Sequence, residues 1–140
     1  MTTRKDVVEE AKSWLGTPYH HLAKIKGAGV DCGQLLIGVY SNVGLIPDIE
    51  TGYYPNDWHF HRSEEQYIGW VSKYAKPTDN PKVGDVMLFK FGRCISHGGI
   101  LVGDNLIIHS YLRQGCVYAR LDDAELNGRL AMCFTLWDDE

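Results

Sequence analysis

Residues 30–44 read VDCGQLLIGVYSNVG, and this stretch predicts a buried helix with a cysteine in its first turn. Asp31 is a residue type that caps helix N-termini, and Gly44 is suited to end the helix. The apolar residues between them recur at helical spacing, at Cys32, Leu35, Leu36, Val39, Tyr40 and Val43. An apolar stripe of this width indicates a helix that packs into the core.

The residues before this stretch predict a shorter helix and then a loop. Thr3 can cap the helix, and Asp6 lies in its first turn, where a negative charge favours the helix dipole. Gly16 is placed to end it, and Thr17–Val30 is expected to be a loop because it contains one proline and two glycines. The apolar positions of this helix are Val7, Val8, Ala11, Trp14 and Leu15.

The residues after Gly44 change from helical to strand-like patterning. Residues 46–61 are rich in turn-forming and aromatic residues, and a further amphipathic helix is expected to carry Tyr67, Ile68, Val71 and Tyr74 and to stop before Pro77. Beyond Pro81 the apolar period falls to about two, which predicts strands at residues 86–89, 100–102, 106–108, 116–118 and 130–137. Helices followed by antiparallel strands indicate a single α+β domain over residues 1–140, with the N-terminal helices on one face of an antiparallel sheet.

Composition argues against several classes of protein. The 140 residues are 44% hydrophobic and 23% charged, which is ordinary for a globular domain. The formal net charge is −4 and Lys and Arg are scattered, so neither a nucleic acid nor an anionic membrane is expected as a partner. No apolar run approaches the ~20 residues of a membrane span, and no apolar segment follows the first six residues. We therefore expect synthesis in the cytoplasm without a signal peptide and no membrane insertion.

Cys32 lies at the start of the predicted helix, a position that suits a nucleophile. The dipole and free N–H groups at a helix start favour the thiolate, which is the form that attacks a carbonyl carbon. Gly33 has no side chain, so the backbone N–H groups of residues 32 and 33 are candidates for holding an oxyanion. The other cysteines, Cys94, Cys116 and Cys133, lie in or beside predicted strands and are interpreted as structural.

A cysteine nucleophile needs a base, and His97 is the best candidate. It begins a predicted strand, and His109 lies on the next one. A three-residue turn at residues 103–105 would place His109 opposite Gly99, on the same face as His97, with the two imidazoles as diagonal neighbours. We expect the Cys32 sulfur over that same face.

Two other groups of histidines keep open interpretations. His20 and His21 are either solvated loop residues or contacts of the site. Asp57, His59 and His61 are either loop residues or the beginning of a metal site.

The chain resembles the NlpC/P60 cysteine peptidases, and within them the short, stand-alone type found near phage tail genes. The matching pieces are Gly16-Thr17-Pro18-Tyr19, Gly29-Val30-Asp31-Cys32-Gly33, Pro81-Lys82-Val83-Gly84-Asp85-Val86, Ser96-His97-Gly98-Gly99-Ile100-Leu101 and Ile107-Ile108-His109-Ser110. The resemblance implies a papain-like fold and hydrolysis of an amide in peptidoglycan stem peptides without a cofactor, often at the γ-D-glutamyl–diamino-acid bond.

The resemblance also assigns roles to individual residues. It makes Cys32 the nucleophile, His97 the base and His109 the residue that orients the base. It matches Tyr19 to a tyrosine that faces the nucleophile, and Asp31 to a residue that can bind the free amine of the stem peptide, although Asp31 is equally explained as a helix cap.

The chain departs from the family pattern in two places. The usual Asp-Cys-Ser-Gly is here Asp-Cys-Gly-Gln, which leaves amine recognition and the scissile bond open. The loop over residues 19–27 is longer than the common form and is similar to the phage-tail type, which predicts phage tail proteins as partners and a place in the virion tail. An inactive structural tail protein and an acyltransferase that uses the same Cys/His site are the alternatives.

Overall fold

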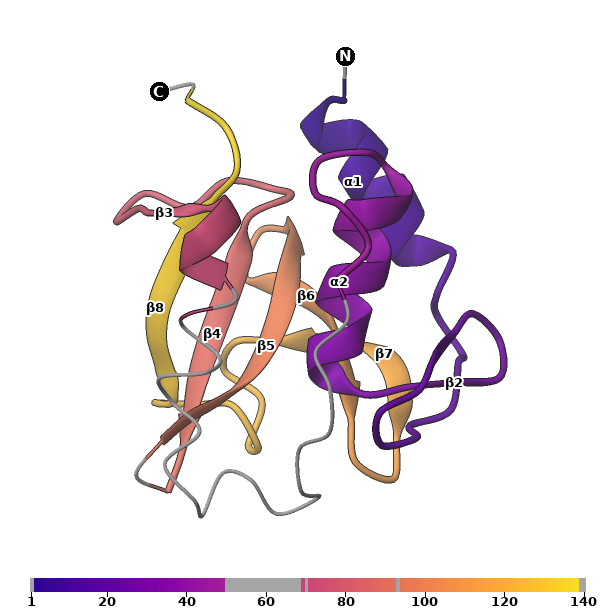
Figure 1. The fold of residues 1–140 in the computed structure, drawn as a ribbon. Helices are drawn as coiled ribbons and strands as arrows, with labels where there is room; N and C mark the ends of the chain where they lie inside the picture. The colour runs from indigo at the N-terminus through magenta and orange to yellow at the C-terminus, as the bar shows by residue number, and fades with distance from the viewer. Residues whose placement is uncertain (1, 50–68, 70, 93, 139–140) are drawn as a thin grey trace.

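The computed structural model describes residues 2–49, 69, 71–92 and 94–138 (Figure 1). Its elements, in chain order, are α1 (Arg4–Lys12), β1 (Lys24–Ile25), β2 (Gly29–Val30), α2 (Cys32–Asn42), β3 (Lys76–Pro77), β4 (Val86–Phe91), β5 (Cys94–Gly103), β6 (Leu106–Tyr111), β7 (Gly115–Arg120) and β8 (Leu130–Thr135). Within these ranges, no helix has the length and apolar character that a bilayer span requires.

Six strands form one antiparallel sheet in the order β3-β8-β4-β5-β6-β7. Strands β4 to β7 follow one another as hairpins, and β8 returns to the free side of β4. The α+β class is therefore confirmed. The edge strand β3 was not predicted, because two residues that include a proline carry no readable period.

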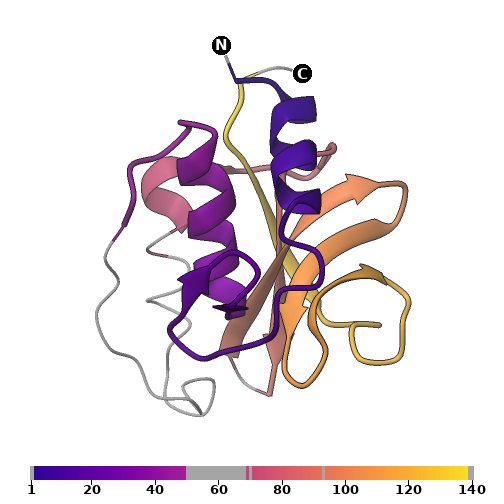
Figure 2. The ribbon, with the colours of Figure 1, turned by 90° about the vertical axis from the view of Figure 1, so that its right-hand side faces the viewer.

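Both N-terminal helices pack on the same face of the sheet, as Figures 1 and 2 show. Thr3 and Asp6 form the reciprocal hydrogen bonds of a capping box at the start of α1. The helix ends at Lys12, earlier than predicted. Trp14 lies in the following turn and is only 2% exposed. Because this buried residue keeps the helical spacing of the apolar positions, the sequence predicts a longer helix than the one observed.

The two faces of the sheet bury separate sets of side chains. On the helical face, α1 and α2 contribute Val7, Leu35 and Val39, which cluster with the strand residues Leu88, Ile100 and Ile108. The opposite face buries Met87, Phe89, Leu101, Ile107, Ala119 and Leu126. Neighbouring residues such as Ile107 and Ile108 thus point to different clusters, as strand geometry requires.

Two predicted segments differ from the structure. The 17–30 loop contains a small hairpin, in which β1 pairs with β2 through Lys24↔Val30 and Ile25↔Gly29. The predicted helix before Pro77 is present at residues 69 and 71–74. Tyr67 and Ile68 lie outside the described residues, as do Asp57, His59 and His61.

Candidate active site

Asp31 holds the start of α2 and the preceding loop together. Its Oδ1 accepts a hydrogen bond from the Gln34 backbone N–H at 2.8 Å, which confirms the predicted N-cap. Its Oδ2 accepts from the Leu22 backbone N–H at 2.8 Å. The side chain is only 2% exposed, so this carboxylate fixes the position of the next residue, Cys32, from both sides.

Cys32 meets the sheet at a β-bulge. Phe89 pairs with His97, but the next residue of β4, Lys90, pairs with Ile95, so Ser96 is an extra residue in β5. The Cys32 Sγ lies 3.7 Å from the Ser96 carbonyl oxygen. The bulge therefore brings the thiol to the residue directly before His97, and bulges commonly re-aim side chains in this way.

His97 and His109 form a direct hydrogen bond. The His97 Nε2 and the His109 Nδ1 are 2.8 Å apart, and both rings are buried. Ile100↔Ile108 and Leu101↔Ile107 are in the predicted register, so the two histidines share a face of the sheet. The prediction that they are diagonal neighbours is confirmed.

The turn that produces this register was predicted incorrectly. Gly103 pairs with Leu106, so the turn contains only Asp104 and Asn105, and Val102 is the extra residue of a bulge. A two-residue turn alone would send His109 to the other face. The bulge adds the missing residue and restores the register.

The predicted position of the Cys32 sulfur also needs correction. His97 and His109 lie four and two residues from Leu101 and Ile107 on their strands, so they share the face of those side chains, which cluster away from the helices. Cys32 belongs to the cluster on the helical face. The Cys32 thiol therefore reaches β5 from the helical side, where its Sγ lies against the carbonyl oxygen of Ser96, the residue directly before His97.

An aromatic shell surrounds the histidine pair, and sequence reasoning missed it. Tyr111 stacks on His109 with ring centroids 5.2 Å apart, and its ring is edge-on to His97 at 5.5 Å. Phe89 and Phe91 lie 5.8 and 5.6 Å from His97. Tyr111 follows His109 by two residues, and this strand alternation was the available signal. The shell limits the orientations that the imidazoles can take.

Burial keeps both imidazoles neutral. It lowers the pKa of His97 well below the ordinary value, and the neighbouring His109 lowers it further. Burial also lowers the pKa of His109, although the Asp123 carboxylate acts in the opposite direction. The pair is therefore uncharged at neutral pH, with His97 in the form that can accept a proton.

These lowered pKa values predict that acid destabilises the protein. Between the unfolded pKa of about 6.5 and the lower folded pKa, the unfolded state binds protons that the folded state does not. The free energy of unfolding in urea should therefore fall between pH 7.5 and pH 5, by about 1–2 kcal/mol for each buried histidine. The variant His109→Asn should lose less stability over the same interval, and equal losses in both proteins would contradict this assignment.

Gly99 leaves the space that His109 occupies. A Cβ at Gly99 would lie 3.2 Å from the His109 Cβ, 3.1 Å from the Ile108 carbonyl oxygen and 2.9 Å from the Ile107 Cδ1. We expect Gly99→Ala to lower the unfolding free energy by about 1–3 kcal/mol and to displace His109. Gly103→Ala on the same strand is the matched control, because its nearest neighbour would be Leu106 at 3.7 Å. Thermal unfolding that ranks the two variants equally would refute this prediction.

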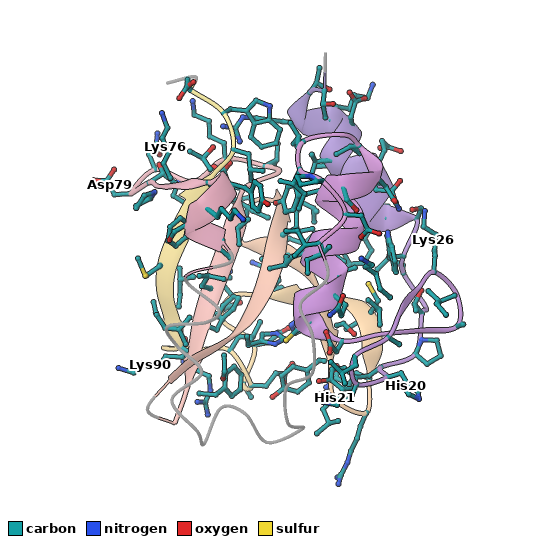
Figure 3. All side chains as sticks on the ribbon, in the orientation of Figure 1. His20, His21, Lys26, Lys76, Asp79 and Lys90 are labelled. Carbon is teal, nitrogen blue, oxygen red and sulfur yellow. The ribbon has the colours of Figure 1, made fainter. Side chains whose placement is uncertain are left out.

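The other predicted site residues lie around the start of α2. Tyr19 forms a parallel bridge to Val30, and burial, together with Cys32 and Asp31, raises the pKa of its hydroxyl. Gly33 is buried in the first turn of the helix. Figure 3 shows His20 and His21 together in the loop below α2, and the His21 Nδ1 lies 3.8 Å from the Asp31 Oδ2. The roles assigned to these residues remain predictions.

A comparison with protein families matches residues 16–132 to the NlpC/P60 family. The chain belongs to the NlpC/P60 family. The matched residues include Cys32, His97, His109 and the loop before α2. No curated protein matches the sequence, and neither finding bears on the phage-tail type.

Solved NlpC/P60 structures share the fold. An NlpC/P60 family protein from Bacillus cereus ATCC 10987 superimposes with a TM-score of 0.71 at 21% identity, over 94% of this chain and 39% of that one. A protein described as similar to lipoprotein, NLP/P60 family, from Staphylococcus aureus Mu50 superimposes with a TM-score of 0.67 at 18% identity, over 97% of this chain and 42% of that one. The NlpC/P60 domain of the peptidoglycan hydrolase SagA superimposes with a TM-score of 0.64 at 16% identity, over 96% of this chain and 99% of that one. The chain thus spans about two fifths of the first two proteins and has the papain-like α+β fold.

Proposed function

We propose that this NlpC/P60 domain is a cysteine endopeptidase or amidase that hydrolyses an amide bond in peptidoglycan stem peptides. The observation that carries the proposal is the buried His97–His109 hydrogen bond beside the bulge that Cys32 contacts. Family membership supports a thiol hydrolase, and the domain of a peptidoglycan hydrolase with the same fold supports a cell-wall substrate.

The hydrogen bond between the rings defines which nitrogen acts as the base. With its Nε2 bonded to His109, the nitrogen of His97 that remains for the Cys32 proton is Nδ1. A neutral imidazole can accept at Nδ1 only if its proton is on Nε2. His97 therefore donates from Nε2, and His109 accepts at Nδ1, which fixes both the tautomer and the orientation of the base.

The proposed reaction proceeds through a thioester. The Cys32 thiol gives its proton to His97 as the sulfur attacks the carbonyl carbon, and the backbone N–H groups of Cys32 and Gly33 hold the developing oxyanion. His97 then returns the proton to the leaving amine as the C–N bond breaks. A water molecule attacks the thioester with His97 as base, which releases the acid and restores the thiol.

Two residues beside the nucleophile are proposed to bind the stem peptide. Tyr19 lies close enough to Cys32 for the thiol to affect the pKa of its hydroxyl. Asp31 caps α2 with its carboxylate and lies directly before the nucleophile. An anionic side chain at this position suits the cationic free amine of a stem peptide, and this contact would place the peptide next to the thiol.

Mass spectrometry of purified muropeptides after digestion tests this function. Hydrolysis should convert a stem peptide into an amine and an acid whose combined mass exceeds the parent by one water. A parallel digestion with an added primary amine separates hydrolysis from acyl transfer, because a transferase would yield the new amide as its main product. Intact muropeptides, or the new amide alone, would contradict the proposal.

We also propose that the protein acts as part of a phage tail. The long 19–27 loop, similar to the phage-tail type, supports this setting, and the partners would be tail proteins. Proteomic analysis of purified virions from producing cells should then detect the chain at a constant ratio to tail proteins. Its absence from virions would refute this part of the proposal.

A further inference from the structure

Ser110 is a buried polar side chain that the proposed reaction does not use. It follows His109 directly on β6 and is completely buried. Side chains alternate along a strand, so Ser110 faces the helices while His109 faces the other side of the sheet. Its pairing partner Cys116, which belongs to the cluster on the helical face, agrees with this orientation. A hydroxyl at such a position needs a hydrogen-bond partner.

The Ser110 hydroxyl donates to the segment that leads into α2. Its Oγ lies 2.7 Å from the Val30 carbonyl oxygen, and the two residues are 80 positions apart in the chain. Val30 is fully buried and is followed by the cap Asp31 and then by Cys32. One hydrogen bond therefore connects the residue directly after His109 with the segment that ends at the nucleophile.

Apolar side chains fill the contact between α2 and the strands β5 and β6. The helix packs on both strands, and its Leu35 clusters with Ile100 and Ile108. Apolar contact is not directional, whereas a hydrogen bond constrains both a distance and an angle. The bond from Ser110 to Val30 thus fixes the start of the helix against β6 more closely than packing alone would.

We propose that Ser110 is a positioning residue that holds the Cys32 end of α2 in place relative to the strand that carries His109. The nucleophile comes from a helix and its base from the sheet, and a displacement of about 1 Å between reacting groups can lower a rate about 100-fold. The catalytic consequence rests on the proposed function, but the reactivity of the Cys32 thiol can be measured without a substrate.

Tyr40 provides the control for a merely structural role. Its hydroxyl also makes a buried hydrogen bond to a backbone carbonyl, that of Gly84, at 2.6 Å. Tyr40 belongs to the same helix but lies about 12 Å along its axis from Cys32. Tyr40→Phe and Ser110→Ala should therefore both lower Tm by about 2–6 °C, while only the second should affect the thiol.

Ser110→Ala removes the hydroxyl and little else. The Val30 carbonyl oxygen keeps its hydrogen bond from the His20 N–H at 3.3 Å, so the acceptor is not left unpaired and the fold should survive. Ser110→Thr and Ser110→Val form a second pair, because the two side chains have nearly the same shape and only threonine retains the donor. Crowding from the larger side chain acts equally on both.

The first test is the rate at which iodoacetamide alkylates Cys32, measured by peptide mass spectrometry between pH 5 and pH 9. Ser110→Ala and Ser110→Val should slow the reaction at pH 7 about tenfold and raise the pH of the half-maximal rate by about one unit, because a displaced thiol gains less from His97. Ser110→Thr and Tyr40→Phe should match the parent. Equal rates in Ser110→Thr and Ser110→Val, or an equal loss in Tyr40→Phe, would overturn the proposal, whether or not the protein cleaves peptidoglycan.

The second test uses the turnover of muropeptides. Ser110→Val should lower kcat about tenfold at an unchanged KM, since the buried hydroxyl cannot contact the substrate, and Ser110→Thr should retain the parent kcat. A loss that appears only in KM would refute the positioning role. An inactive parent whose Cys32 alkylation still follows the expected order would contradict the proposed function and support the role of Ser110.

Discussion

Cys32→Ala is expected to abolish the cleavage of muropeptides while leaving the fold intact. The substitution removes the nucleophile and therefore the thioester route, so we expect a loss of at least about 10⁴-fold in kcat. Alanine is smaller by one sulfur atom and sits at a helix start whose cap, Asp31, is unchanged, so the expected cost to stability is about 1 kcal/mol. Turnover is measured by mass spectrometry, and folding by circular dichroism and thermal unfolding.

Cys116→Ala provides the control for packing. Cys116 is also buried, at 1% exposure, and burial raises the pKa of its thiol to about 12. Its replacement should cost a similar amount of stability with full retention of activity. Cleavage by Cys32→Ala at the parent rate would show that another group is the nucleophile.

His109→Leu should produce the next largest loss, about 10²–10⁴-fold in kcat/KM. Leucine fills most of the buried volume but offers no acceptor to the His97 Nε2, which would be left as an unpaired buried donor. His97 would then lose both its tautomer preference and its orientation. The stacking of His109 on Tyr111 would also be lost, but the loss of this contact alone would lower kcat/KM only about tenfold.

His109→Asn separates the hydrogen bond from the ring. Its amide oxygen can accept from the His97 Nε2, so this variant should recover at least tenfold of the activity that His109→Leu loses. Steady-state kinetics of the two variants decides the point. Equal activity in His109→Leu and the parent would mean that His109 does not orient the base.

The parts of the site with local signals were predictable from the sequence. Thr3 and Asp31 cap α1 and α2 as expected, because a cap depends on residues within one turn. The caps needed no knowledge of how distant segments pack. The shared face of His97 and His109 was also predicted, from alternation along adjacent strands, but it holds only because the Val102 bulge offsets the incorrectly predicted turn.

The rest depends on contacts between distant segments. The bulges at Ser96 and Val102 set the position of Cys32 and the register of His109, but neither residue type marks a bulge. The hydrogen bond from Ser110 to Val30 joins residues that are 80 positions apart in the chain. Such features arise from tertiary packing, which a local pattern does not encode.

Site-resolved alkylation of the cysteines at pH 7 tests the central claim most directly. In this account the helix start and His97 activate Cys32, whereas burial raises the pKa values of the Cys116 and Cys133 thiols. Peptide mass spectrometry after timed exposure to iodoacetamide should show Cys32 modified at least ~100-fold faster than either, and His97→Ala should remove most of this advantage. Modification of Cys32 no faster than Cys133, or a rate that His97→Ala leaves unchanged, would contradict an activated thiol and favour an inactive structural protein.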